Sequence, residues 1–205
     1  MSDPQPAATP PGADPRDPVP APRVDPALDA RLREHAEAIR AKIRDIPDFP
    51  QPGILFRDIT PLLADGAAFQ GLVDAVTERY RGQIDAVVAI ESRGFIFGAP
   101  LAYALGVGLV PVRKAGKLPD RTLREEYTLE YGTATLEIHH DAVHHGERVL
   151  LVDDLLATGG TVRAAANLVE RLGGEIAGVF VLAELSALGG RDRLAAYDVT
   201  TLVVY

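Results

Sequence analysis

The 205-residue sequence has no cysteine, no tryptophan and a single methionine. Without cysteine, neither a disulfide framework nor a thiolate metal cage can form, so nothing in the fold depends on an oxidising compartment. The sequence also lacks any run of about 18 uncharged apolar residues, and its start has no basic segment followed by an apolar run. We therefore expect a cytosolic protein with neither a membrane span nor a secretion signal.

Positive charge is also scarce in this chain. The sequence has 21 Lys and Arg against 29 Asp and Glu, which gives a formal net charge of -8. Broad affinity for nucleic acid needs a field of basic side chains, which this composition does not provide. A polyanionic small molecule fits better as a ligand, provided that basic residues are concentrated locally.

The first 26 residues have almost no large apolar side chains, and they contain nine of the 16 prolines. Such a segment cannot bury enough apolar surface to fold, so we expect a disordered tail over residues 1–26. A helical pattern then begins, with apolar residues three or four positions apart at Leu28, Leu32, Ala36, Ile39 and Ile43. We expect one domain over residues 27–205, a length that supports a single core.

Short apolar runs alternate with helical stretches over the rest of the chain. Strands are expected at residues 86–90, 108–112, 133–138, 148–152 and 176–182, and helices at residues 67–80, 94–105 and 161–172. This alternation predicts an α/β fold, in which a twisted parallel sheet is flanked by helices and joined by right-handed crossovers. Ligands of such sheets bind at the carboxyl ends of the strands.

The most informative segment reads VLLVDDLLATGGTV, from Val149 to Val162. An apolar strand ends in Asp153 and Asp154, and a loop then opens into a helix; the loop residues are Ala157, Thr158, Gly159, Gly160 and Thr161. Glycine N–H groups can approach an anion closely, and threonine hydroxyls beside a helix N-terminus add donors, so the loop suits a phosphate monoester. The two carboxylates can accept hydrogen bonds from ribose hydroxyls or orient a hydrated Mg²⁺.

Two alternatives compete for this segment. A strand, an Asp cap and a glycine turn without any ligand would have the same outline, but buried strand ends seldom carry two unpaired acids. A triphosphate-binding loop needs Gly-x-x-x-x-Gly-Lys followed by Ser or Thr, whereas Gly160 is followed by Thr161 and Val162. The pattern therefore favours a site for one phosphate.

Two other segments place basic residues at strand ends. Arg93 follows the strand AVVAI in the sequence ESRG, and Arg113, Lys114 and Lys117 follow the strand GLVPV in the densest basic cluster of the chain. A pyrophosphate carries the negative charge that these groups would neutralise. Taken alone, a structural ion pair of Arg93 and a solvated basic turn are the competing interpretations.

In their order, these motifs resemble the type I phosphoribosyltransferases, whose signature is an apolar strand, two acids and a Thr-Gly-Gly-Thr type of loop. The resemblance extends from about residue 43 to residue 190 and is closest to the adenine-specific members. It implies a purine-salvage pentosyltransferase that joins adenine to 5-phosphoribosyl 1-diphosphate with Mg²⁺, giving AMP and pyrophosphate. It also implies a small hood, a flexible catalytic loop, and a homodimer in which some basic groups of ESRGF and RKxGKLP reach pyrophosphate across the interface.

A polar stretch between Lys117 and Thr133 is too irregular for a helix and long enough to form a lid that keeps water out. Glu130 and Tyr131 lie in it, and with Gly132 they match the Glu-Tyr-Gly of the family. The resemblance implies that Glu130 manages the proton of the base, that Tyr131 packs over the ribosyl centre, and that Arg93 acts beside them. Taken alone, the two would be an ordinary surface acid and a half-buried aromatic.

The segment IPDFPQPGILFRDITPLL has a Pro and Gly framework that predicts an extended ledge, on which a flat base can lie against Leu55 and Phe56. The resemblance implies that main-chain groups of Leu55 and Arg57 read the base, that Leu155 covers its face, and that Arg57 supports the closed loop. Guanine and hypoxanthine enzymes of this fold use a hood lysine, which AELSALGGRDRL lacks. Adenine is therefore the expected base.

The competing functions are a ligand-sensing regulator of the same fold and a transferase for another purine base. Such regulators usually carry a DNA-binding module, which the polar first 26 residues cannot form. Glu130 in the lid also favours the enzyme. Four histidines, His139, His140, His144 and His145, flank a turn without the spacing of a metal site, so we expect no metal there.

Overall fold

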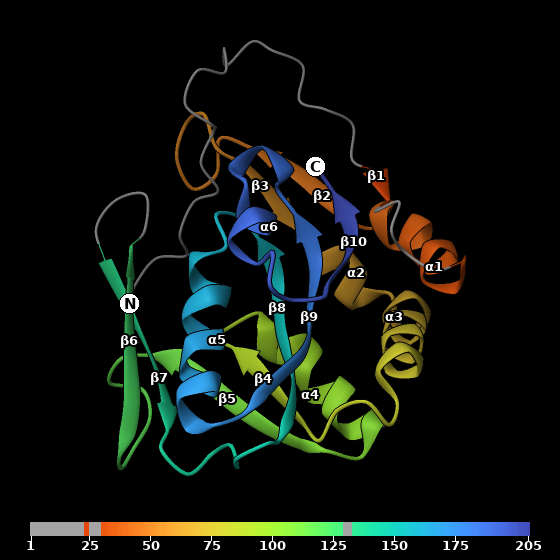
Figure 1. Ribbon diagram of the computed structural model, residues 1–205. Coiled ribbons are helices and arrows are strands. Elements are labelled where there is room, and N and C mark those ends of the chain that lie inside the picture. Colours follow the sequence, from red (N-terminus) through yellow and green to blue (C-terminus); the bar gives the residue numbers. More distant parts are fainter. Residues whose placement is uncertain (1–22, 25–29, 129–132) are drawn as a thin grey trace.

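The computed structural model describes residues 23–24, 30–128 and 133–205. Its main feature is an eight-stranded sheet (Figure 1). In spatial order the strands are β1 (Arg23–Val24), β10 (Val199–Val204), β9 (Glu175–Glu184), β8 (Arg148–Leu156), β4 (Ala86–Ile90), β5 (Gly108–Lys114), β7 (Thr133–His139) and β6 (Thr122–Thr128). A separate hairpin pairs β2 (Arg44–Pro47) with β3 (Leu55–Asp58).

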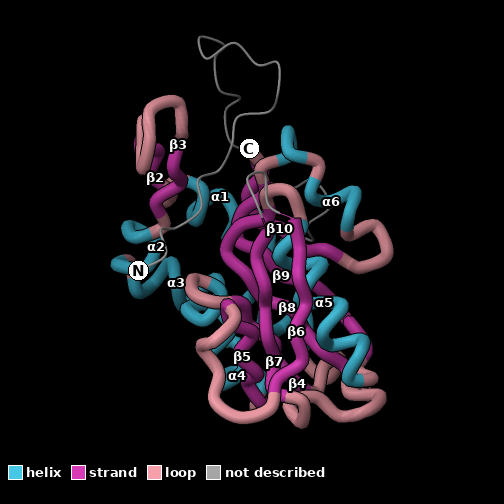
Figure 2. The backbone as a smooth tube through the Cα atoms, turned by 90° about the vertical axis from the view of Figure 1, so that its left-hand side faces the viewer, coloured by secondary structure: helices cyan, strands magenta, loops and turns pink. Residues whose placement is uncertain are grey.

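The helices connect these strands and cover the large sheet on both sides (Figure 2). They are α1 (Ala30–Arg40), α2 (Thr60–Ala64), α3 (Gly66–Tyr80), α4 (Gly94–Leu105), α5 (Gly160–Leu172) and α6 (Gly190–Arg193), with a 3-10 turn η1 at Ser186–Leu188. None of the helices in these ranges combines the length and the apolar character that crossing a bilayer requires.

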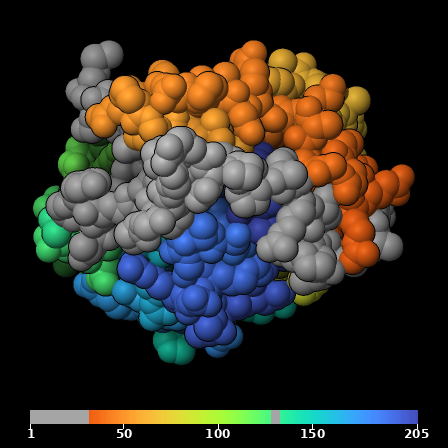
Figure 3. Space-filling view, turned by 90° about the horizontal axis from the view of Figure 1, so that it is seen from above, coloured from red at the N-terminus to blue at the C-terminus, as the bar shows by residue number. Residues whose placement is uncertain are grey.

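Five neighbouring strands, from β10 through β9, β8 and β4 to β5, run parallel. The expected α/β fold with a parallel sheet is therefore confirmed at the centre. The outer strands β1, β7 and β6 pair antiparallel, so the complete sheet is mixed. Strands β8 and β9 finish at one end of the molecule, where the β2–β3 hairpin and the segment around α6 also lie (Figure 3).

Neighbouring residues of the central strands enter two different cores. Val87 and Leu150 belong to one cluster, which includes buried residues of α1, α3 and α4. Val88 and Leu151 belong to the other, which includes the apolar residues of α5. Because successive side chains of a strand point to opposite faces, a strand that is apolar throughout is buried on both sides.

The expected bounds of the 86–90 strand and the 94–105 helix are confirmed as β4 and α4. The stretch between Lys117 and Thr133 forms no helix among its described residues, but the expectation of irregular structure was wrong for Thr122–Thr128, which form β6 and pair with β7; the lid role stays a prediction. Charged side chains can occupy an edge strand when the main chain pairs with a neighbouring strand. Residues 129–132 of this segment lie outside the described residues.

Candidate functional site

The acidic pair lies within β8, which continues past the expected end at Val152 to Leu156. Asp154 is buried and Asp153 is half-buried, and the Asp154 N–H donates to Asp153 Oδ1 at 2.9 Å. Burial raises the pKa of both carboxyls, and the negative charge of Asp154 raises the pKa of Asp153 further, well above its usual value. Keeping such a pair ionised requires a nearby cation.

Arg93 supplies that cation and connects three segments of the chain. Its Nε lies 2.9 Å from an Asp154 carboxylate oxygen, and its guanidinium carbon lies 5.5 Å from the centre of the Phe56 ring in β3. Arg93 directly precedes α4 and follows a cis peptide bond between Glu91 and Ser92. The ion pair considered for Arg93 thus exists, and it joins the acidic pair to the predicted base ledge.

The phosphate loop, residues 157–161, follows β8 directly and opens into α5. Gly159 caps this helix with a φ of +78°, a conformation that favours glycine, and no side chain caps the helix by a hydrogen bond. The first N–H groups of an uncapped helix suit an anion. Thr161 Oγ1 donates to the Tyr127 hydroxyl at 3.4 Å, so the loop also contacts β6.

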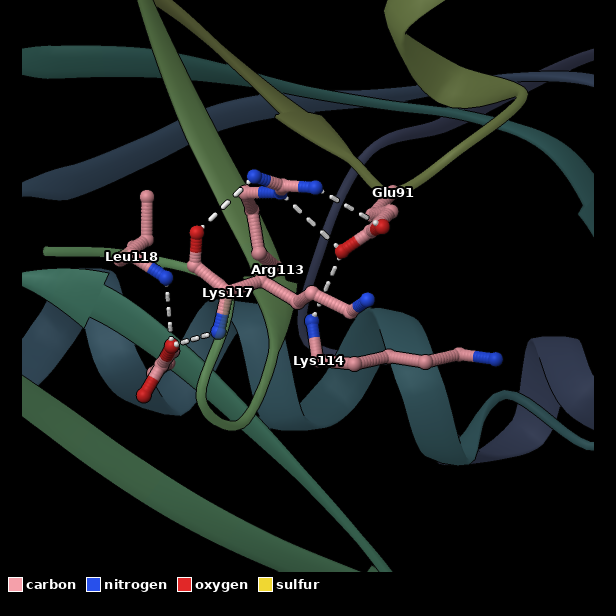
Figure 4. A network of polar contacts seen from close by, with 6 residues as sticks. Glu91, Arg113, Lys114, Lys117 and Leu118 are labelled. Carbon is pink, nitrogen blue, oxygen red and sulfur yellow. Dashed lines mark hydrogen bonds and ion pairs between the residues drawn. The ribbon is translucent and has the colours of Figure 1, made fainter. Parts of the chain in front are cut away.

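Arg113, near the end of β5, is fixed by the carboxylate of Glu91, which directly follows β4 (Figure 4). Its Nε and Nη2 lie 3.2 and 3.1 Å from the two carboxylate oxygens of Glu91, and its Nη1 donates to the Lys117 carbonyl oxygen at 2.9 Å. Burial would raise the pKa of Glu91, but Arg113 and the Lys114 N–H outweigh this effect and lower it. Arg113 therefore connects the turn after β5 to Glu91, which lies two residues before Arg93 in the sequence.

Lys114 and Lys117 present their side chains differently. The buried Glu137 accepts hydrogen bonds from the Lys117 and Leu118 N–H groups at 2.8 and 2.9 Å, which fixes the main chain of the turn. Burial opposes ionisation of Glu137, but these main-chain donors lower its pKa overall. Within the described residues, the Lys114 and Lys117 ammonium groups form no salt bridge (Figure 4). They are the exposed cations of the turn.

The predicted base ledge is the β2–β3 hairpin. Leu55 and Phe56 are half-buried in β3, and the Phe56 ring packs edge to face on Phe49, with 5.1 Å between ring centres. The Arg57 side chain is buried, forms an ion pair with Asp45, and has its guanidinium carbon 3.8 Å from the centre of the Tyr205 ring. The Arg57 side chain thus stabilises the fold through these contacts, while its main chain is part of the ledge.

Phe49 and Tyr205 did not emerge from the sequence as ledge residues. An exposed aromatic at Phe49 has no local signal beyond its Pro neighbours, and Tyr205 is far from the ledge in sequence. Leu155, the residue expected to cover the base, is half-buried in β8 and pairs with Ala183 of β9. Glu130 and Tyr131 fall outside the described residues, so their expected roles stay predictions.

A cavity of about 410 Å³ lies between β6 and α5. It is lined by residues of both elements and by Arg193, and it reaches the phosphate loop at Gly160. Asp153, Asp154 and Arg93 are not among its lining residues. The cavity therefore lies beside the predicted site rather than over the acidic pair.

Residues 62–204 match the family model of the phosphoribosyl transferase domain. An adenine phosphoribosyltransferase of Acidothermus cellulolyticus is 58% identical over 168 residues, which cover 82% of this chain and 95% of the relative. The adenine phosphoribosyltransferase of Chloroflexus aurantiacus is 59% identical over 164 residues, which cover 80% and 95% of the two chains. The chain belongs to the adenine phosphoribosyltransferases.

Solved structures of this family share the fold. The adenine phosphoribosyltransferase of Thermoanaerobacter pseudethanolicus has a TM-score of 0.80 at 55% identity, covering 83% of this chain and 99% of that chain. The Saccharomyces cerevisiae enzyme, solved with adenine and an imino-altritol bisphosphate, has a TM-score of 0.79 at 42% identity, covering 82% and 98%. The predicted family, fold and enzyme class are confirmed: the chain is a pentosyltransferase of purine salvage with adenine phosphoribosyltransferase function.

Proposed function

We propose that this adenine phosphoribosyltransferase holds its donor across the ends of β4, β5 and β8. The contact of Arg93 with both Asp154 and Phe56 carries the proposal, since it connects the sugar site to the base site. The phosphate loop would bind the terminal phosphate of the donor through its N–H groups and the hydroxyls of Thr158 and Thr161. Asp153 and Asp154 would accept hydrogen bonds from the ribose hydroxyls.

Pyrophosphate would lie against the cations of the two other strand ends. Arg93, Lys114 and Lys117 offer positive groups there, while Arg113 positions the turn through Glu91. A pyrophosphate leaving group develops charge as its bond to C1 of the ribose breaks, and fixed cations stabilise that charge most when water is excluded. These residues would therefore favour departure of pyrophosphate.

Adenine would lie on the ledge of Leu55 and Phe56, with Leu155 over its other face and the main chain of Leu55 and Arg57 reading its edge. The new bond forms between the base nitrogen and C1, and that nitrogen loses its proton. Glu130 is proposed to take up this proton and Tyr131 to shield the cation-like ribosyl centre from water. The Arg57 side chain, which contacts Asp45 and the Tyr205 ring, would keep the ledge in place.

Mg²⁺ is proposed as the cofactor. Among the described residues, no group of three His, Asp or Glu side chains could enclose a metal ion, so an ion held by protein ligands alone does not fit. Two adjacent carboxylates that share an ion with substrate phosphates and water do fit the coordination preferences of Mg²⁺. Asp153 and Asp154 would hold it through water and ribose hydroxyls, and the ion would neutralise the diphosphate.

The base preference can be tested by mixing the purified chain with the donor, Mg²⁺ and each purine base in turn. We expect AMP from adenine, dependent on Mg²⁺, and no GMP or IMP from guanine or hypoxanthine, because the hood segment, residues 183–194, offers no lysine for a 6-oxo group. Chromatography of the products gives the answer. GMP or IMP formed as fast as AMP would show that the ledge does not select adenine.

A homodimer is proposed, because α4 presents an apolar face to solvent. Ile96, Ala99 and Tyr103 are exposed at helical spacing, with the Tyr103 side chain 90% exposed, and the neighbouring Leu109 is also exposed. Tyr103→Asp is expected to shift a dimer to monomer in sedimentation equilibrium, while Arg81→Asp, at an exposed position after α3, leaves it dimeric. A monomeric wild-type chain at micromolar concentration would contradict this proposal.

Residues 1–26 are proposed to lie outside the catalytic domain, which spans residues 27–205. Two of them, Arg23 and Val24, form β1, a two-residue edge strand that pairs with β10, and the family match begins only at residue 62. Deleting residues 1–26 is expected to leave kcat and KM for adenine unchanged, because two paired residues contribute little to the sheet. A truncation at residue 22 serves as control, and loss of activity in the longer deletion alone would assign a role to β1.

A cytosolic setting is proposed as well. The phosphoribosyl donor and the product AMP are phosphorylated, and such charged molecules do not cross a bilayer unaided. Because the chain has no cysteine, its fold contains no disulfide that a reducing compartment could break. Recovery of the native protein outside the soluble cytosolic fraction of its cells would oppose this assignment.

A further inference from the structure

The main chain of the hood segment, residues 183–194, packs directly against the phosphate loop, residues 157–161. A Cβ added to Gly190 would lie 2.1 Å from the Ala157 carbonyl oxygen and 3.0 Å from the Gly159 nitrogen. A Cβ added to Gly159 would in turn lie 2.6 Å from the Gly190 carbonyl oxygen. Both glycines are buried, so two backbone segments from different parts of the sequence pack with no side chain between them.

The contact itself, rather than backbone conformation, requires glycine at position 190. Gly159 has a positive φ, which favours glycine for local reasons, but Gly190 does not. An alanine at position 190 could therefore adopt the same backbone conformation, and its Cβ would clash only with the phosphate loop. Since main-chain atoms cannot rotate away as a flexible side chain can, the loop or the hood must move.

Arg191 fixes the hood to the sheet beside this contact. Its Nε and Nη2 donate to the carboxylate of the buried Glu184 at 3.0 and 2.5 Å, Nη1 donates to the Val199 carbonyl oxygen, and Nη2 donates to Thr201 Oγ1. Glu184 is the last residue of β9 and pairs with Leu156, the last residue of β8. The hood is therefore held at the level where the chain leaves β8 and enters the phosphate loop (Figure 1).

We propose that Gly190 is a positioning residue for phosphate binding: held by the Arg191–Glu184 ion pair, it sets the main-chain position of the phosphate loop. The inference rests on the proposed role of that loop. Because a terminal phosphate is bound in both the ground state and the transition state, a displaced loop weakens binding without slowing the bound complex much. Ligands without this phosphate are unaffected.

The test is calorimetric titration of wild type and Gly190→Ala with ribose 5-phosphate, AMP and pyrophosphate. We expect the Kd of the first two ligands to rise about 10- to 100-fold in Gly190→Ala, the effect of a displacement of about 1 Å, with pyrophosphate binding unchanged. In kinetics the KM for the donor rises, whereas kcat changes less than about threefold. Gly66→Ala, where an added Cβ meets nothing within 4 Å, is the matched control and keeps wild-type values.

Three further outcomes separate the possibilities. Wild type that binds no ribose 5-phosphate, or Thr161→Ala that binds it as tightly as wild type, defeats the proposed phosphate site. Folded Gly190→Ala with wild-type Kd values, or with equal losses for all three ligands, overturns the positioning role alone. If Gly190→Ala does not fold, Glu184→Gln is the deciding variant, because it removes the charge that holds Arg191. We expect Glu184→Gln to raise the Kd for ribose 5-phosphate and AMP only. An unchanged Kd for these two ligands overturns the inference.

Discussion

Replacing Asp153 and Asp154 together by asparagine is expected to lower kcat/KM for the phosphoribosyl donor by about 30- to 100-fold. Each carboxylate is proposed to accept a hydrogen bond from a ribose hydroxyl, and hydrogen bonds to charged groups contribute about 1.5–3 kcal/mol each. Asparagine keeps a neutral acceptor but loses the charge, so weakening the two hydrogen bonds costs about 2–3 kcal/mol in total. About 1.4 kcal/mol corresponds to a factor of ten. Steady-state kinetics with saturating adenine and varied donor measures the loss.

The same double variant is not expected to lose stability. The folded-state pKa of Asp153 is raised well above its ordinary value by burial and by repulsion from Asp154, so this group lowers stability progressively as the pH rises from its unfolded-state pKa toward its folded-state pKa. Asparagine removes this repulsion, so at neutral pH the Tm should stay the same or rise. Asp141→Asn, whose side chain is 76% exposed after β7, is the control and should change neither quantity. A double variant with wild-type kcat/KM would show that the pair does not hold the sugar.

The centre of the sheet was predictable because its pattern is local. Ala86–Ile90 are five consecutive apolar residues that are all buried, and they form β4 within the expected bounds. The end of β8 was missed because Asp153 and Asp154 interrupt the apolar run. The strand nevertheless continues, since Arg93 from another segment offsets the buried charge of Asp154.

Contacts between distant segments could not be predicted from periodicity. β6 has a charged sequence, but Glu125 accepts hydrogen bonds at 2.8 Å from Asn167 and Arg171 of α5, which fixes the strand against that helix. Tyr205 packs under the Arg57 guanidinium in a cation–π contact, and Gly190 packs on Gly159 because their backbones fit closely. The sequence therefore indicated which motifs form the site, while these tertiary contacts determine how each motif is held.

Replacing Glu130 by alanine is expected to lower kcat by about 100-fold, the lower end of what general acid–base catalysis contributes. The proton on the base nitrogen must leave as the bond to C1 forms, and the resemblance to the family assigns its transfer to Glu130. Binding of AMP does not depend on that transfer, so its Kd should change less than about threefold. Rapid product assays at saturating substrates give kcat, and calorimetry gives the Kd.

Glu126→Ala provides the matched control, since Glu126 is an exposed acid of β6, on the strand that leads toward Glu130. Its kcat should stay close to that of wild type. Glu130→Gln keeps the shape of the side chain but not its basicity, so it should be nearly as slow as Glu130→Ala and should lose the acid limb of the pH profile of kcat. If the glutamine variant instead recovers wild-type kcat, Glu130 acts through shape or hydrogen bonding, and another group must take the proton.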